Sequence, residues 1–195
     1  IRLPFQDLGG ECLFSSEWDK FSIKTYAANF GELPKGDISK ISSWEIPSHD
    51  ILLAGFPCQA FSQAGLRKGF ADTRGTMFFE IQRILAAKQP KAFLLENVKH
   101  LRGHDGGKTF KTIVSVLREL GYQTIEYKIL NAKDFGVPQN RERLIIVGIR
   151  NDLNLSHGEL GTYYASATLL SAFLLYWCGK LTDKVNITSL IGFNR

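Results

Sequence analysis

Short apolar runs alternate along the chain with longer segments in which apolar residues recur at helical spacing. The spacing predicts helices over 19–30, 75–88 and about 109–120, each followed within two residues by a glycine or proline. The apolar runs predict strands over 11–16, 51–54, 92–95, 124–130 and 144–149. Strands that alternate with helices of this length are typical of a doubly wound, mostly parallel α/β sheet.

The pattern changes after residue 150. Residues 161–179 form an uncharged run of 19 residues, which is close to the minimum for a bilayer span. Threonine, serine, tyrosine and glycine dilute the run, which favours a buried or partner-covered helix over a membrane span. The pattern therefore predicts one α/β domain over residues 1–152. It leaves a tail over 153–195 in which one apolar helix is the only element suggested, and no membrane partner is expected.

Composition adds a weak indication about partners and location. The 195 residues suffice for one good core, and the net charge of +5 mildly favours an anionic partner. The three cysteines are widely separated and form no CxxC pair. This spacing suggests neither a zinc site nor a disulfide framework, so no metal is expected and a reducing, cytoplasmic location fits best.

The first candidate for chemistry is Cys58, in the loop that follows the apolar strand 51–54. An isolated cysteine is most often a small buried hydrophobe. However, open α/β sheets build active sites where strands end, and basic neighbours lower the pKa of a thiol. The loop holds several polar and basic residues, namely Gln59, Ser62, Arg67, Lys68 and Arg74. The residues alone leave both interpretations of Cys58 open.

Two further candidates lie at the ends of neighbouring predicted strands. Glu96 follows the run 92–95 and is expected beside Cys58 at the carboxyl edge of the sheet; the alternative is a helix cap or a solvent-facing turn. Arg141 and Arg143 are two residues apart before the strand 144–149, so they point to one face and could converge on the same pocket. The alternative for this charged segment is a solvated strand edge.

Three segments resemble signature blocks of the cytosine carbon-5 DNA methyltransferases of the bacterial restriction–modification type. They are Gly55-Phe-Pro-Cys-Gln-Ala-Phe-Ser62, Glu96-Asn97-Val98 and Gln139-Asn-Arg-Glu-Arg143, and their order and spacing also fit the family. The resemblance covers about residues 1–152. It implies a Rossmann-like, S-adenosylmethionine-dependent methyltransferase fold and an enzyme that methylates double-stranded DNA.

The resemblance also implies a role for each catalytic candidate. The thiolate of Cys58 adds to carbon 6 of a cytosine, and Glu96 hydrogen-bonds N3 of the ring. Arg143 holds the cytosine oxygen, and Arg141 supports the thiol and the pocket. Carbon 5 then takes the methyl group of S-adenosylmethionine. The target atoms are stacked inside the duplex, so the cytosine must be flipped out, with the loop 59–74 as the natural lid.

The cofactor-binding residues that the resemblance implies are Glu17, Trp18, Asp37, Ile38, Pro57 and Met77. Glu17 would take the ribose hydroxyls and Trp18 would offer an aromatic face to the adenine. Asp37 and Ile38 match the block that contacts the adenine edge. Without the resemblance, residues 17–19 would be an ordinary helix start capped by Asp19.

The sequence departs from the family at both ends, so the sheet is expected to be incomplete. The glycine-rich first block, which forms the central strand and the cofactor turn, should precede Ile1, and its absence predicts an unpaired interior edge. After Asp152, neither a target-recognition domain nor the family's return segment is recognisable. We therefore expect a truncated methyltransferase catalytic domain. The alternatives are an inactive remnant and one half of a split enzyme that needs a second polypeptide.

Overall fold

The computed structural model of the chain describes residues 1–57, 77–136, 138–153 and 190–193. The α-helices in these ranges are α1 (Arg2–Asp7), α2 (Lys20–Phe30), α3 (Met77–Lys88) and α4 (Lys108–Glu119). The strands are β1 (Cys12–Ser16), β2 (Ile51–Gly55), β3 (Ala92–Val98), β4 (Thr124–Asn131), β5 (Glu142–Ile149) and β6 (Leu190–Phe193). Short 3-10 helices connect these elements. Two of them precede β2, namely η1 (Ile38–Lys40) and η2 (Ser43–Glu45). Further along the chain are η5 (Lys99–Gly107), η6 (Ala132–Phe135) and η7 (Asn151–Leu153).

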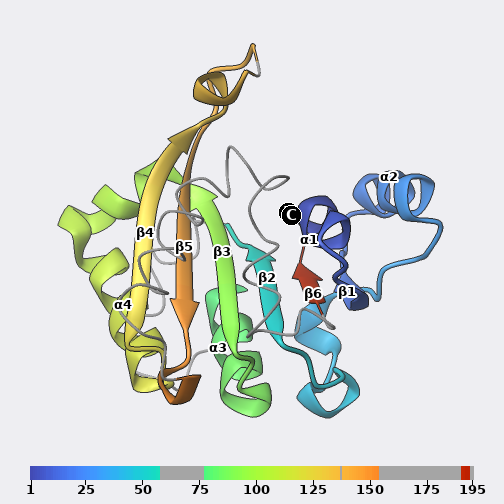
Figure 1. The fold of residues 1–195 in the computed structure, drawn as a ribbon, viewed down its shortest axis with the longest axis horizontal. Coiled ribbons are helices and arrows are strands. Elements are labelled where there is room, and N and C mark those ends of the chain that lie inside the picture. The colour runs from blue at the N-terminus through green and yellow to red at the C-terminus, as the bar shows by residue number, and fades with distance from the viewer. Residues whose placement is uncertain (58–76, 137, 154–189, 194–195) are drawn as a thin grey trace.

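The six strands form one sheet in the order β1-β6-β2-β3-β5-β4. The pairs β1–β6, β6–β2 and β2–β3 are parallel, whereas β5 runs antiparallel to both β3 and β4. In Figure 1 the arrowheads of β2, β3 and β6 accordingly point to the opposite end of the sheet from that of β5. The mixed α/β sheet agrees with the predicted Rossmann-like class, and β5 is its one reversed strand among the described residues.

Alternating side chains of the strands build two cores, one on each face of the sheet. The larger core joins Leu52, Ala54, Phe93 and Leu95 to the buried faces of α3 and α4. The smaller core joins Ile51, Leu53 and Leu94 to Phe5 of α1. Helices therefore cover both faces, as the doubly wound architecture requires.

Local sequence signals account for the ends of α2. Asp19 accepts hydrogen bonds from the backbone N–H groups of Phe21 and Ser22, which caps the helix. Gly31 ends it in the left-handed conformation, with φ of 70°. A residue with a side chain would be strained there, which explains the glycine.

Two elements differ from the sequence prediction. Helix α1 spans residues in which no element was expected. Strand β6 lies in the tail that had no assignment, and it pairs with β1 on one side and β2 on the other. The interior edge that was expected to be unpaired is therefore filled by residues 190–193. The apolar run 161–179 lies outside the described residues.

Gly148 of β5 is required by close packing against Phe93. A Cβ atom built on Gly148 would lie 2.2 Å from Cζ of Phe93, a ring that is buried and packs edge-on against Tyr122. We expect Gly148→Ala to lower the free energy of unfolding by about 1–3 kcal/mol, measured by urea denaturation, because the ring must move within a packed core. Gly103→Ala is the matched control, since a Cβ there meets nothing within 4 Å. Equal loss in both variants would contradict this account.

Candidate active site

The carboxyl ends of β1, β2 and β3 meet at one edge of the sheet (Figure 1). Strand β2 ends at Gly55 and continues through buried Phe56 and half-buried Pro57 toward Cys58. The parallel register places Gly55 directly opposite Glu96 of β3. Cys58 and the predicted loop residues lie outside the described residues (Gln59, Ser62, Arg67, Lys68 and Arg74).

Glu96 and Arg143 form an ion pair at this edge. Nε of Arg143 lies 2.6 Å from Oε1 of Glu96, and the two side chains are 25% and 24% exposed. Val98 is the register partner of Arg143, and Ile145 is the partner of Glu96. Residues two apart on a strand share a face, so Glu96 and Arg143 are diagonal neighbours across the β3–β5 pair. The pair is thus a mostly covered ion pair beside the end of β2, where Gly55 is the register partner of Glu96.

Asn131 anchors the segment that brings Arg143 to β3. Its side chain is buried, its Nδ2 donates to Oδ1 of Asn140 at 2.7 Å, and its Oδ1 accepts from the backbone N–H of Arg141 at 3.1 Å. The side chain of Arg141 is exposed. The structure therefore places Arg143 against Glu96. The backbone of Arg141 instead holds the connection between β4 and β5, through its hydrogen bonds with Asn131 and Ala132. Nothing in the sequence pattern singled out Asn131.

Asn97 links the end of β3 to the start of the Cys58 loop. It is 2% exposed, and its Nδ2 donates to the carbonyl of Phe56 at 2.7 Å. Its Oδ1 accepts from the backbone N–H of Val98 at 2.9 Å. A buried amide with both ends engaged fixes the backbone two residues before Cys58.

Glu17 follows β1 at the same edge and is 2% exposed. Its Oε1 accepts from the backbone N–H groups of Trp18 and Asp19, at 2.9 and 3.0 Å. Its Oε2 is buried and has no hydrogen-bond partner among the described residues. A buried carboxylate oxygen without a partner is costly, so the site is suited to a ligand that donates a hydrogen bond. Trp18 is 73% exposed beside it.

The backbone ties Glu17 to the segment that carries Asp37 and Ile38. The N–H of Glu17 donates to the carbonyl of Lys35 at 3.0 Å. Asp37 caps η1, and hydrogen bonds from the hydroxyl and the backbone N–H of Ser39 hold the pKa of Asp37 below its usual range. Asp37 is therefore ionised at neutral pH and keeps the start of η1 fixed.

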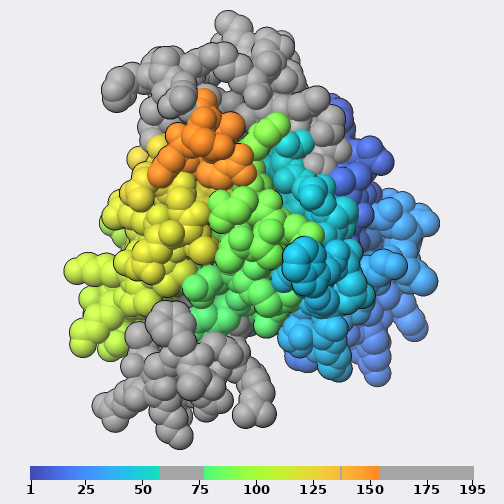
Figure 2. Space-filling model, turned by 90° about the horizontal axis from the view of Figure 1, so that it is seen from below, coloured from blue at the N-terminus to red at the C-terminus, as the bar shows by residue number. Residues whose placement is uncertain are grey.

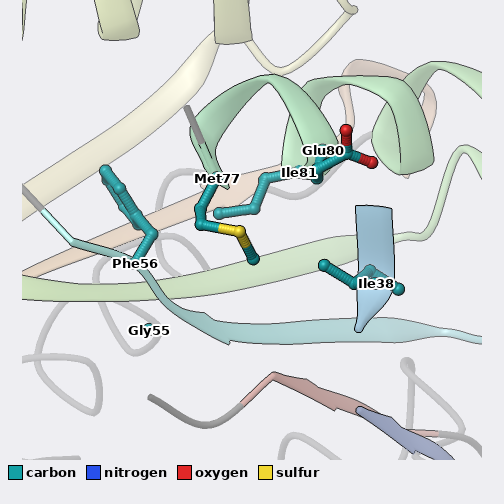
Figure 3. A pocket seen from close by; sticks show the side chains of 6 residues that line it. All are labelled: Ile38, Gly55, Phe56, Met77, Glu80 and Ile81. Atoms are coloured by element: carbon teal, nitrogen blue, oxygen red, sulfur yellow. The ribbon is translucent and has the colours of Figure 1, made fainter. Parts of the chain in front are cut away.

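A shallow hollow lies between η1, the end of β2 and the start of α3. It is lined by Ile38, Gly55, Phe56, Met77, Glu80 and Ile81. In Figure 3 the side chain of Met77 extends from α3 toward β2, the side chain of Ile81 extends toward Met77, and the carboxylate of Glu80 points away from Phe56. Ile38 and Met77 were sequence candidates, whereas Phe56, Glu80 and Ile81 were not. Glu80 and Ile81 lie three and four residues after Met77, so helical spacing could have identified them.

Comparison with protein-family models gives a match over residues 1–173, to the family described as C-5 cytosine-specific DNA methylase. The match covers most of the chain. The chain belongs to this family.

Type II methyltransferases share high identity with the chain. It is 62% identical over 157 residues to the type II methyltransferase M.SsoII of Shigella sonnei, covering 80% of the chain and 41% of that protein. It is 56% identical over 173 residues to the type II methyltransferase M.HaeII of Haemophilus aegyptius, covering 88% of the chain and 54% of that protein. The chain thus spans about half the length of these type II methyltransferases.

Solved structures show the same fold. A Dnmt2 methyltransferase from S. pombe matches with a TM-score of 0.58 and 24% identity, over 77% of the chain and 51% of that protein. A putative DNA modification methyltransferase encoded within an E. coli prophage matches with a TM-score of 0.59 and 22% identity, over 79% of the chain and 44% of that protein. At this identity the likeness concerns the methylase fold alone.

Two further observations concern membranes and metals. Within residues 1–57, 77–136 and 138–153, no helix is long and apolar enough to cross a membrane. Over the same residues, no cluster of three or more histidine, cysteine, aspartate or glutamate side chains could hold a metal ion.

Proposed function

We propose that the chain is the catalytic part of a DNA cytosine-5 methyltransferase of a restriction–modification system, acting on double-stranded DNA with S-adenosylmethionine and without a metal. The observation that supports this most is the register of β2 and β3. Gly55 lies opposite Glu96, and Arg143 lies 2.6 Å from Glu96. The proposed nucleophile, Cys58, follows Gly55 by three residues in the sequence, so the proposal assigns Glu96 and Arg143 to the same site.

The residues of the carboxyl edge fit S-adenosylmethionine. The unpartnered Oε2 of Glu17 suits a ribose hydroxyl, and exposed Trp18 suits stacking on the adenine. The apolar hollow beside Ile38 and Met77, next to Asp37 and Pro57, suits the adenine edge. When bound, S-adenosylmethionine supplies an electrophilic methyl group.

The side chains have distinct roles in the proposed reaction. The thiolate of Cys58 adds to carbon 6 of a flipped-out cytosine, which makes carbon 5 nucleophilic. Glu96 supplies a hydrogen bond and a proton at N3, so the ring carries no full negative charge. Arg143 orients Glu96 and holds the cytosine oxygen, and Arg141 supports the pocket. After methylation, water takes the proton of carbon 5 and the bond between carbon 6 and sulfur breaks with release of the thiolate. N3 then returns its proton to Glu96, which leaves neutral 5-methylcytosine.

DNA contacts are assigned to the loop after Cys58. Its basic residues Arg67, Lys68 and Arg74 would neutralise phosphates, and Gln59 and Ser62 lie next to the nucleophile. The flipped base has to be shielded from water, which a loop of this length could achieve. The proposed location is the bacterial cytoplasm, where the DNA substrate lies.

The purified chain should transfer labelled methyl from S-adenosylmethionine to double-stranded DNA that contains cytosine. The product should be 5-methylcytosine after nuclease digestion. Absence of transfer together with absence of S-adenosylhomocysteine binding would refute the proposal. Transfer that requires a second polypeptide would support the split form of the enzyme instead.

Glu96→Gln is expected to lower kcat by about 100-fold or more, because the amide keeps the shape but cannot supply a proton at N3. Steady-state methyl transfer at saturating S-adenosylmethionine measures this. Glu126→Gln on β4 is the control, because Glu126 is exposed and β5 separates its strand from β3. Unchanged kcat in the Glu96 variant would remove Glu96 from the mechanism.

A further inference from the structure

One arginine of α3, Arg83, binds the segment of η1 and η2 at three points. Nη2 of Arg83 donates to the backbone carbonyls of Ile38, at 3.1 Å, and Ile41, at 3.0 Å. Nη1 of Arg83 donates to Oγ of Ser43 at 2.6 Å. Three acceptors from a stretch of six residues thus converge on one guanidinium group. In Figure 2 the green surface of α3 borders the cyan and light-blue surface that precedes β2.

Glu80 holds the guanidinium group in this orientation. Nε and Nη2 of Arg83 lie 2.8 and 2.7 Å from Oε2 of Glu80, one turn earlier on α3. The two side chains are 33% and 21% exposed, so the pair is mostly covered. An exposed ion pair contributes little, but a covered arginine that also satisfies two carbonyls and a hydroxyl has a defined geometry.

Helix α3, which carries Arg83, forms one wall of the hollow, and η1 forms the wall opposite it. Ile38, which is 2% exposed, lines the hollow from η1, and Met77 and Ile81 line it from α3. The carbonyl of Ile38 is one of the groups that Arg83 holds. Arg83 therefore belongs to the α3 wall of the hollow and binds the η1 wall directly, in addition to the packing of Ile38 in the core.

We propose that Arg83 is a positioning residue that sets the width of the adenine-binding hollow by fixing Ile38 against Met77 and Ile81. The ligand named here rests on the proposed S-adenosylmethionine dependence. A flat base gains affinity from apolar side chains only when they lie at van der Waals distance on both of its sides. Displacement of one wall therefore weakens cofactor binding but leaves the residues that contact the reacting atoms in place. Arg83 thus acts on cofactor affinity through the η1–η2 segment.

Lysine cannot replace this arginine fully. The guanidinium presents five donors in a rigid fork, whereas the ammonium group is a single point on a flexible chain. A lysine ammonium group could bind Glu80 or one backbone carbonyl, but it could not bind the carbonyls of Ile38 and Ile41 and the hydroxyl of Ser43 at the same time. Arg83→Lys should therefore lie between the wild type and Arg83→Met, which keeps the apolar stem and removes every donor.

The test measures S-adenosylhomocysteine binding by calorimetry and methyl transfer by the whole chain. Arg83→Met should raise Kd roughly tenfold and Arg83→Lys by a smaller factor. The KM for S-adenosylmethionine should rise in parallel, while kcat at saturation stays within about threefold of the wild-type value. The lost interaction stabilises the bound cofactor equally in the ground state and the transition state, so its loss changes KM and not kcat. Arg118→Met is the matched control, because Arg118 is an exposed arginine on α4. It should behave as the wild type.

Hydrogen exchange of the protein without ligand gives a second, independent readout. Amides of residues 38–45 should exchange faster in Arg83→Met than in Arg118→Met, with the amides of β3 unchanged. Equal exchange, or wild-type Kd in Arg83→Met, would overturn the role of Arg83 while leaving the proposed function intact. A wild-type chain that binds no S-adenosylhomocysteine would overturn the proposed cofactor, and with it the ligand assigned to the hollow.

Discussion

Cys58→Ser is expected to reduce methyl transfer by about 1,000-fold or more. The proposed reaction needs a thiolate to add to carbon 6 of cytosine. A serine hydroxyl stays protonated near neutral pH and is a far weaker nucleophile without a general base. Binding of S-adenosylhomocysteine should persist, because the substitution exchanges only a sulfur atom for an oxygen atom and leaves every cofactor candidate, including the neighbouring Pro57, unchanged. Labelled methyl transfer and calorimetry on the same preparation separate the two effects.

A matched cysteine provides the control for this prediction. Cys12 of β1 is half-buried, and its Sγ lies 3.5 Å from the carbonyl of Phe14. Cys12→Ser should leave transfer close to the wild-type rate.

DNA with 5-fluorocytosine at the target adds a direct probe, because fluorine cannot leave carbon 5 as a proton does. The wild type and Cys12→Ser should form a stable protein–DNA adduct on a denaturing gel. An adduct in Cys58→Ser would refute the assignment of the nucleophile.

Much of the fold could be predicted because its signals are local. Periodicity, the Asp19 cap and the Gly31 terminator identify α2 within one residue of its observed bounds. By contrast, β6 has four residues, and its partners on β1 and β2 are more than 130 positions away in the sequence. No local pattern encodes such a pairing, and the same holds for the reversed direction of β5. Strand existence is a local property, whereas strand order is not.

The candidate site divides in the same way. Motif blocks pointed to Glu96 and Arg143, and the structure places these two side chains in contact. The sequence does not mark Arg83 as a site residue, because the amphipathic pattern of α3 is fully accounted for by the packing of its apolar face against the sheet. Its spacing from Glu80 suggests an ion pair on the helix surface, but its bonds to the η1–η2 segment depend on how α3 packs. Residues that act through other residues leave little trace in a single sequence.

Ile191→Pro is expected to lower the free energy of unfolding by about 2–4 kcal/mol, because it breaks β6 between two partner strands. Ile191 is the register partner of Phe14 on β1 and of Leu52 on β2, so a proline there loses a backbone donor inside the sheet. Ile191→Val keeps the donor and should cost about 1 kcal/mol at most. Urea denaturation compares the two variants, and equal midpoints would show that β6 contributes little. The functional consequence follows from the strand order. Strand β1 leads to Glu17 and β2 leads to Cys58, so in Ile191→Pro the affinity for S-adenosylhomocysteine and the rate of methyl transfer should fall together.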